Sequence, residues 1–110
     1  MLHATLLPLL PALRALCRRF GVQEMYLFGS AVTPQFDPAR SDADVLVRLP
    51  PLPPLVEGDT LLRLWDELET LLHRRVDLLT PGSLQNPFLQ AEINRTKEVI
   101  YDAARTEIPV

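Results

Sequence analysis

Apolar residues recur at helical spacing near the N-terminus of the chain. Within residues 8–20, one side of the predicted helix carries Leu9, Leu13, Leu16, Cys17 and Phe20. The arginines of this stretch fall on the other side, and Gly21 suits the position just past the last turn. Because proline is tolerated only in a first turn, we expect the helix to begin at Pro8 or Pro11 and to end at Phe20.

Four short apolar runs have the composition of β-strands. They cover residues 25–28, 44–49, 75–79 and 97–101. The second run leads into LPPLPPLV at residues 49–56, whose four prolines predict a stiff loop. A polyproline-type ligand is the alternative interpretation of this stretch.

Two further helices are expected between the strands. Asp59 is a suitable N-cap for a helix over residues 60–73. The apolar face of that helix is predicted to enter the core through Leu61, Trp65, Leu68 and Leu72. For Trp65, a partner interface is the alternative. Asn86, followed by a proline, is a second start signal, for a helix that ends near Asn94.

The expected order of elements is helix, strand, strand, helix, strand, helix, strand. This order predicts an α/β (α+β) fold with a small mixed β-sheet flanked by helices. A length of 110 residues suffices for one domain, and we assign residues 1–110 to it, with residues 102–110 as a C-terminal tail.

Composition and charge limit the classes of function. A net charge of −3 argues against a protein that coats DNA or RNA, because such proteins need a basic surface. The single cysteine, Cys17, cannot form an internal disulfide, which fits a reducing cytoplasm. The sequence contains no run of about 18 apolar residues, so we predict no membrane span. The apolar N-terminus lacks a leading basic stretch, so we interpret it as a helix of the mature protein rather than a signal peptide.

Two acidic residues stand one residue apart where the second strand begins. In a strand, Asp42 and Asp44 would project from the same face with Cα atoms about 6–7 Å apart. Two carboxylates placed in this way repel each other, and the usual remedies are protonation of one or binding of a hard divalent cation. Mg²⁺ prefers one or two carboxylates together with phosphate oxygens and water. Taken alone, such a pair is more often a solvated loop or a helix cap.

A third acidic residue, Asp77, lies in the apolar third strand. If that strand pairs beside the second, Asp77 joins the other two carboxylates on one face of the sheet. Three acids on adjacent strands can hold two metal ions about 3.5–4 Å apart, which is the layout for phosphoryl or nucleotidyl transfer. A surface ion pair with Arg74 or Arg75 is the alternative for Asp77 alone, and these arginines are expected to be a solvated helix end.

A Gly-Ser pair, Gly29 and Ser30, ends the first strand. Glycine at a strand end lets the backbone approach a ligand closely, and the following N–H groups with the serine hydroxyl can bind phosphate oxygens. An isolated Gly-Ser is usually a turn. Its combination with the three acids predicts a phosphate-binding function.

The segments YLFGS, SDADVLV and RRVDLLTPGSL resemble the minimal nucleotidyltransferase family of the DNA polymerase β superfamily. The resemblance extends from the first helix to the last strand. The family signature of Gly-Ser, a loop, Asp-x-Asp and a later acid matches Gly29, Ser30, Asp42, Asp44 and Asp77. The resemblance implies a mixed sheet flanked by helices. It also implies transfer of a nucleoside monophosphate from a nucleoside triphosphate by a two-metal Mg²⁺ site, with all three aspartates as catalytic residues and metal ligands.

Paired members of this family act as antitoxins of HEPN-domain ribonuclease toxins. The resemblance therefore implies an enzyme that transfers AMP from ATP to a tyrosine hydroxyl of a HEPN partner, in a homo-oligomer or a complex with the toxin. No direct nucleic-acid or membrane partner is expected. Two alternatives remain: an inactive relative that neutralises its partner by binding alone, and a small-molecule (drug) nucleotidyltransferase, which the lack of an acceptor domain disfavours.

The loop between the two halves of the signature departs from the family pattern. Eleven residues separate Ser30 from Asp42, one more than is usual, and an extra loop residue costs little entropy. Many relatives also carry an arginine and a glycine soon after the Gly-Ser, where this chain has Ala31-Val32-Thr33-Pro34. Arg40 and Arg48 are the candidates to replace that arginine.

Overall fold

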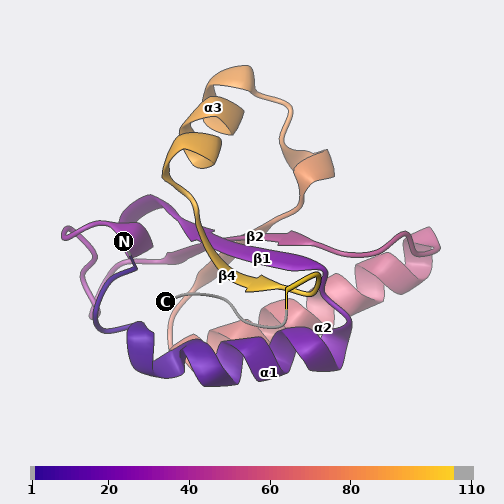
Figure 1. Ribbon diagram of the computed structural model, residues 1–110, viewed down its shortest axis with the longest axis horizontal. Coiled ribbons are helices and arrows are strands. Elements are labelled where there is room, and N and C mark those ends of the chain that lie inside the picture. Colours follow the sequence, from indigo (N-terminus) through magenta and orange to yellow (C-terminus); the bar gives the residue numbers. More distant parts are fainter. Residues whose placement is uncertain (1, 106–110) are drawn as a thin grey trace.

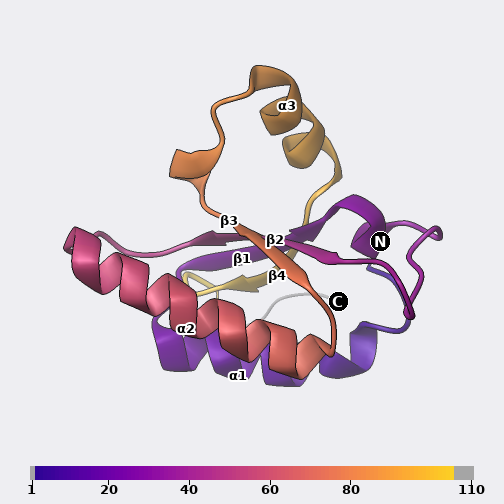
Figure 2. The same ribbon diagram turned by 180° about the vertical axis from the view of Figure 1, so that it is seen from behind.

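The computed structural model describes residues 2–105 and consists of a four-stranded sheet with two helices on one face and a third on the other (Figures 1 and 2). The long helices α1 and α2 lie side by side beneath the sheet, and α3 stands above it. In chain order the elements are α1 (Leu10–Phe20), β1 (Glu24–Phe28), β2 (Ala43–Arg48), α2 (Pro54–Leu72), β3 (Val76–Leu79), α3 (Pro87–Thr96) and β4 (Glu98–Asp102), with short 3₁₀ turns η1 (Leu7–Leu9), η2 (Gly29–Val32) and η3 (Pro81–Ser83).

The strands are arranged in the order β3-β2-β1-β4. Strand β1 runs antiparallel to both of its neighbours, whereas β2 and β3 are parallel. The predicted mixed sheet and α/β class are therefore confirmed. The register places Asp44 opposite Phe28 on one side and opposite Asp77 on the other.

Alternation along β2 divides the sheet into an apolar face and a face that carries the acids. Ala43, Val45 and Val47 are fully buried beneath the sheet, in the main core against α1 and α2. The intervening positions face α3, where Leu46 joins a smaller cluster with Phe28 and Ile93. Asp44 therefore lies on the α3 side, because successive side chains of a strand point to opposite faces.

The ends of α1 and α3 follow the start and stop signals of the sequence. Helix α1 ends at Phe20, and Gly21 takes a left-handed φ of 69° with its N–H bonded to the carbonyl oxygens of Arg18 and Cys17. The Asn86 side chain caps α3 by accepting the N–H groups of Phe88 and Leu89. Both predicted ends are confirmed.

Helix α2 begins at Pro54, and the prediction that Asp59 caps a helix starting at residue 60 is wrong. Proline suits the first helical position, since its missing N–H would have no partner in the helix there. Asp59 consequently lies inside the helix, where its carboxylate pairs with Arg63 at 3.1 Å. The helix also contains Gly58 in its second turn.

The prediction that Trp65 is a core residue is also wrong, since 37% of its surface is exposed. Leu64, Leu68 and Leu72 form the buried stripe of α2 instead. The indole N–H of Trp65 donates to the Val76 carbonyl oxygen at 2.7 Å, and the Glu69 carboxylate accepts the Val76 N–H at 2.9 Å. Because β3 is an edge strand, these two side chains cover backbone groups that no strand reaches.

Two further expectations concern the rest of the chain. Among residues 2–105, no helix has both the length and the apolar character needed to cross a membrane. Strand β4 includes Asp102, so the predicted tail begins one residue later, and residues 106–110 lie outside the described part of the chain.

The early start of α2 predicts that Gly58→Ala raises the free energy of unfolding by about 0.5–1 kcal/mol, because alanine is the better former of a helix interior. A Cβ at Gly58 would meet no atom within 4 Å. Urea unfolding of the variant measures the change.

Asp59→Ala is the matched comparison. It should change stability by less than about 0.5 kcal/mol, since it removes only an exposed ion pair. A loss of about 1 kcal/mol at Asp59 with no gain at Gly58 would indicate an N-cap and contradict the earlier start.

Candidate active site

Three aspartates meet at the start of β2, on the sheet face that carries α3. Asp44 lies within β2, Asp42 directly precedes that strand, and Asp77 is the register partner of Asp44 in β3. Asp42 and Asp77 are exposed, whereas Asp44 is partly buried. The structure thus brings together the three carboxylates that the sequence singled out, although 32 residues lie between Asp44 and Asp77 in the chain.

Burial and like charge act together on Asp44. The pKa of this carboxyl is raised to about 6, first by desolvation on burial and then by the Asp77 charge, by hydrogen bonding with the Asp77 side chain and by the Asp42 charge. Each of these causes penalises the ionised form of Asp44. Ionisation of Asp44 at neutral pH therefore costs free energy, because burial and the neighbouring carboxyl groups oppose it.

The backbone of Gly29 lies against the Asp44 carboxylate. Gly29 has a φ of 66°, and a Cβ at this position would overlap Oδ2 of Asp44. Only glycine can adopt this φ and also leave room for the Asp44 carboxylate without strain. Ser30 follows within η2, and its carbonyl oxygen accepts the Thr33 N–H at 3.0 Å and the Thr33 hydroxyl at 2.9 Å. The Gly-Ser turn is thus packed directly beside the acidic cluster.

A pocket of about 370 Å³ opens next to Asp44. Its walls come from the end of β1, from η2 and from α3, and they include Phe28, Gly29, Leu89 and Ile93. Most of the lining area is apolar, and Asp44 and Glu92 are the two charged residues in the lining. A pocket of this kind, with few polar groups, is typical of a small-molecule site.

The donor types fit a hard divalent cation. Among residues 2–105, no three His, Cys, Asp or Glu side chains stand in the geometry that coordinates a metal ion. The Asp44 and Asp77 carboxyl groups lie close enough for Asp77 to raise the pKa of Asp44. Burial and the neighbouring like charges together raise the Asp44 pKa, and a cation would offset both. Oxygen ligands are those that Mg²⁺ prefers.

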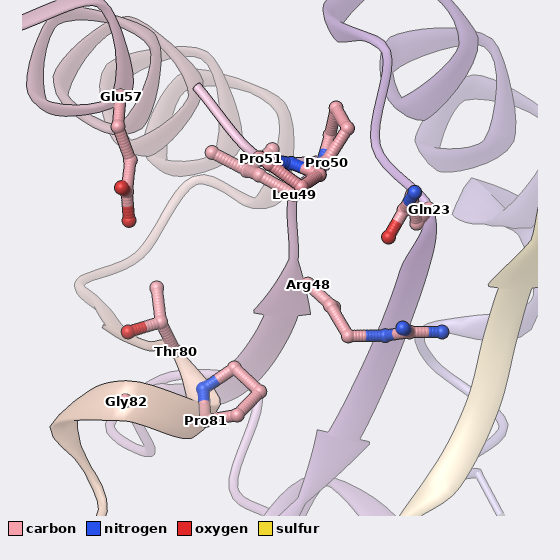
Figure 3. Close-up of a pocket in the computed structure, with 9 residues that line it drawn as sticks. All are labelled: Gln23, Arg48, Leu49, Pro50, Pro51, Glu57, Thr80, Pro81 and Gly82. Carbon is pink, nitrogen blue, oxygen red and sulfur yellow. The ribbon is translucent and has the colours of Figure 1, made fainter. Parts of the chain in front are cut away.

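Arg48 does not replace the arginine that is missing from the loop after Ser30. It ends β2, at the opposite end of the strand from Asp42, and its guanidinium pairs with Glu24. Figure 3 shows this side chain extending away from Thr80 at a second pocket, of about 360 Å³, between the ends of β2 and β3. Arg40 is exposed in the loop before Asp42.

Two residues near the site were missed by the sequence reasoning. Phe36, in the loop before Asp42, is only 3% exposed and belongs to the main core. Arg74 places its guanidinium over the Phe36 ring, 4.7 Å from the centroid, and so is not simply a solvated helix end. A lone aromatic residue in a polar loop was the available signal for Phe36.

A family model described as "Nucleotidyltransferase domain" matches residues 12–102. The chain belongs to this family. The match includes every predicted site residue of this nucleotidyltransferase domain, from Gly29 to Asp77. No curated protein matches the chain.

Solved structures share the fold of this nucleotidyltransferase domain. A proposed minimal nucleotidyltransferase is 30% identical with a TM-score of 0.66, over 86% of this chain and 91% of that chain. A toxin–antitoxin structure with AMP-PNP is 22% identical with a TM-score of 0.62, over 86% and 73%. A tri-AMPylated Shewanella oneidensis HEPN toxin in complex with its MNT antitoxin gives 20% identity and a TM-score of 0.57, over 86% and 71%. The resemblance inferred from the sequence is confirmed.

The contact between Gly29 and Asp44 predicts that Gly29→Ala destabilises the protein by more than Gly21→Ala. Both glycines have nearly the same φ, 66° and 69°, so both variants bear the cost of about 1 kcal/mol for a left-handed alanine. Only at Gly29 would the new methyl group also displace Asp44, whereas nothing lies within 4 Å at Gly21. Urea unfolding compares the two, and equal losses would show that Gly29 is required for its φ alone.

The raised pKa of Asp44 predicts that Asp44→Asn stabilises the metal-free protein at pH 7.5, by about 1 kcal/mol once partial exposure is allowed for. The folded pKa lies above the unfolded value of 3.8, so ionisation destabilises the fold, and this cost develops as pH rises from about 4 to 6. The gain should therefore shrink at pH 4.5. Chemical unfolding at both pH values measures it, and Asp66→Asn, an exposed carboxylate on α2, is the control. A gain that is equal at both pH values would contradict the assignment.

Proposed function

We propose that the chain is a Mg²⁺-dependent nucleotidyltransferase that transfers AMP from ATP to a tyrosine hydroxyl of a HEPN-domain toxin, and thereby acts as its antitoxin in the cytoplasm. The observation that carries this proposal is the pairing of Asp44 with Asp77 across parallel strands, with Gly29 packed against the Asp44 carboxylate. In a nucleotidyltransferase domain, that arrangement suits a metal-bound triphosphate.

The proposed reaction is a displacement at the α-phosphorus of ATP. The tyrosine oxygen forms the new bond to this phosphorus, while the bond to the bridging oxygen of the leaving diphosphate breaks and that oxygen keeps the electron pair. Asp77, the exposed member of the strand pair, accepts the hydroxyl proton. The products are an adenylylated tyrosine, diphosphate and one proton.

The other residues bind and orient the triphosphate. Bound Mg²⁺ would neutralise the phosphate oxygens and the leaving diphosphate, and Asp42, Asp44 and Asp77 would hold it. Gly29 and Ser30 would offer backbone N–H groups and a hydroxyl to the phosphates. The apolar pocket beside Asp44 would keep water from the reacting groups.

A partner must supply the acceptor in this proposal. The pocket beside Asp44 is bounded by the chain's own α3, and Phe88 and Leu89 at the start of that helix are exposed. Structural neighbours include an MNT antitoxin in complex with a tri-AMPylated HEPN toxin, which supports a HEPN-domain acceptor and a hetero-oligomer.

Neutralisation of the toxin by binding alone is the second candidate. The observation that favours it is the missing arginine after Ser30, a position that Arg48 does not serve because it pairs with Glu24 at the far end of β2. A binder of this kind would need the surface of the fold but not the three carboxylates.

The enzyme proposal predicts that Asp42→Asn combined with Asp44→Asn lowers AMP transfer roughly 10³-fold, since metal ions contribute several kcal/mol to stabilising the transition state. The assay mixes the chain, ATP, Mg²⁺ and a HEPN-domain protein, which the proposal expects to be encoded beside the gene of the chain. Mass spectrometry then identifies adenylylated tyrosine. Asp66→Asn should transfer as the wild type does.

Toxin neutralisation in cells separates the two candidates. The enzyme proposal predicts that the double variant no longer protects cells that express the toxin, although it still folds. Full protection by the double variant would contradict the enzyme proposal and support binding alone. Absence of a toxin-like HEPN neighbour would contradict both.

A further inference from the structure

The loop between Ser30 and Asp42 is tied into the fold rather than projecting from it. Phe36 is buried in the main core, with its ring 5.2 Å from that of His3. Asp37 and Ser41 close a turn: the Asp37 N–H donates to the Ser41 hydroxyl at 2.8 Å, and the Ser41 N–H donates to the Asp37 carbonyl oxygen at 2.8 Å. The loop therefore delivers the chain to Asp42 along a defined path.

Arg74 holds this path through three contacts of one guanidinium. Its Nε–H donates to the Leu72 carbonyl oxygen at 3.1 Å, and Nη1 donates to the Ser41 carbonyl oxygen at 3.1 Å. Its central carbon, Cζ, lies over the Phe36 ring, 4.7 Å from the ring centroid. A rigid planar fork suits donation in two directions together with stacking, whereas a lysine ammonium cannot make all three contacts from one position.

Arg74 and Arg75, two successive residues, bond to the backbone on the two sides of Asp42. The Ser41 carbonyl oxygen, just before Asp42, is bonded to the Arg74 side chain. The Ala43 N–H, just after it, is bonded to the Arg75 carbonyl oxygen at 2.9 Å. Asp42 itself is exposed and precedes the strand, so these two flanking hydrogen bonds fix the backbone position from which its side chain projects.

We propose that Arg74 is a positioning residue that fixes Asp42 relative to Asp77. Arg74 lies three residues before Asp77, between the end of α2 and the start of β3. Its contact with Ser41 ties the segment that carries Asp42 to the segment that carries Asp77, across 33 residues of chain. The catalytic consequence rests on the proposed nucleotidyl transfer, whereas the structural tie does not.

The test is Arg74→Lys, with Arg75→Lys as the matched control because the Arg75 side chain is exposed and only its backbone enters the tie. Amide hydrogen exchange is followed at Arg40, Ser41 and Ala43, all of which donate backbone hydrogen bonds. Exchange there should become about 10-fold faster in Arg74→Lys than in the wild type, as expected for loss of a charge-assisted hydrogen bond, while amides of β4 keep their rates.

Transfer kinetics with ATP give the functional readout. We expect kcat of Arg74→Lys to fall about 10- to 100-fold, as for other residues that orient metal ligands, with KM for ATP nearly unchanged. Arg75→Lys should match the wild type in exchange and in kcat. Should Arg74→Lys fold poorly, Phe36→Leu keeps an apolar side chain in the core but removes the stacked ring, and it should shift exchange at the same amides.

Two results would overturn the proposal. Unchanged exchange at the three amides would show that Arg74 does not hold the loop, and faster exchange with unchanged kcat would show a purely structural role. If the wild type transfers no AMP, the proposed function fails separately. The exchange rates then still decide whether Arg74 ties the two segments. The rise in Tm on adding Mg²⁺ decides whether that tie serves the carboxylates, because this rise should be smaller in Arg74→Lys than in Arg75→Lys.

Discussion

The burial of the Asp44 carboxyl group beside the like-charged carboxyl group of Asp77 is the constraint on which the site depends. The parallel pairing of β2 with β3 places them in register, and burial prevents water from screening Asp44 fully. A fold selected for stability alone would hold an apolar pair here, as it does two positions along on the same face, where Leu46 faces Leu79. The acidic pair therefore destabilises the metal-free fold, and a bound cation with the triphosphate would reverse this effect.

The rest of the fold holds these groups in place. The apolar face of the sheet packs on α1 and α2, so that β2 is anchored from below while its Asp44 faces the pocket beside α3. Trp65 and Glu69 bond the outer edge of β3 at Val76, directly before Asp77. Arg74 ties the same region to the loop before Asp42. The edge strand, which would otherwise fray, is thus held from two sides.

The parts of this arrangement that depend on local pattern could be predicted from the sequence. Alternation along β2 assigned Asp44 and Val45 to opposite faces, and Asn86 before a proline marked the start of α3. Long-range choices could not be predicted. Trp65 fits an apolar helical face equally well, and only the position of β3 reveals that its N–H serves the strand edge. Arg74 likewise resembles a solvated helix end until the loop that contacts it is placed.

The central claim is that cation binding relieves the repulsion at Asp44, and a carboxyl ¹³C NMR titration of Asp44 tests it most directly. The titration is run without metal and then with Mg²⁺ and AMP-PNP. Without metal the account predicts a pKa of about 6 for Asp44, and with Mg²⁺ and the nucleotide it predicts a clear decrease. A pKa that is the same in both titrations would contradict the account, because the three carboxylates would then hold no cation.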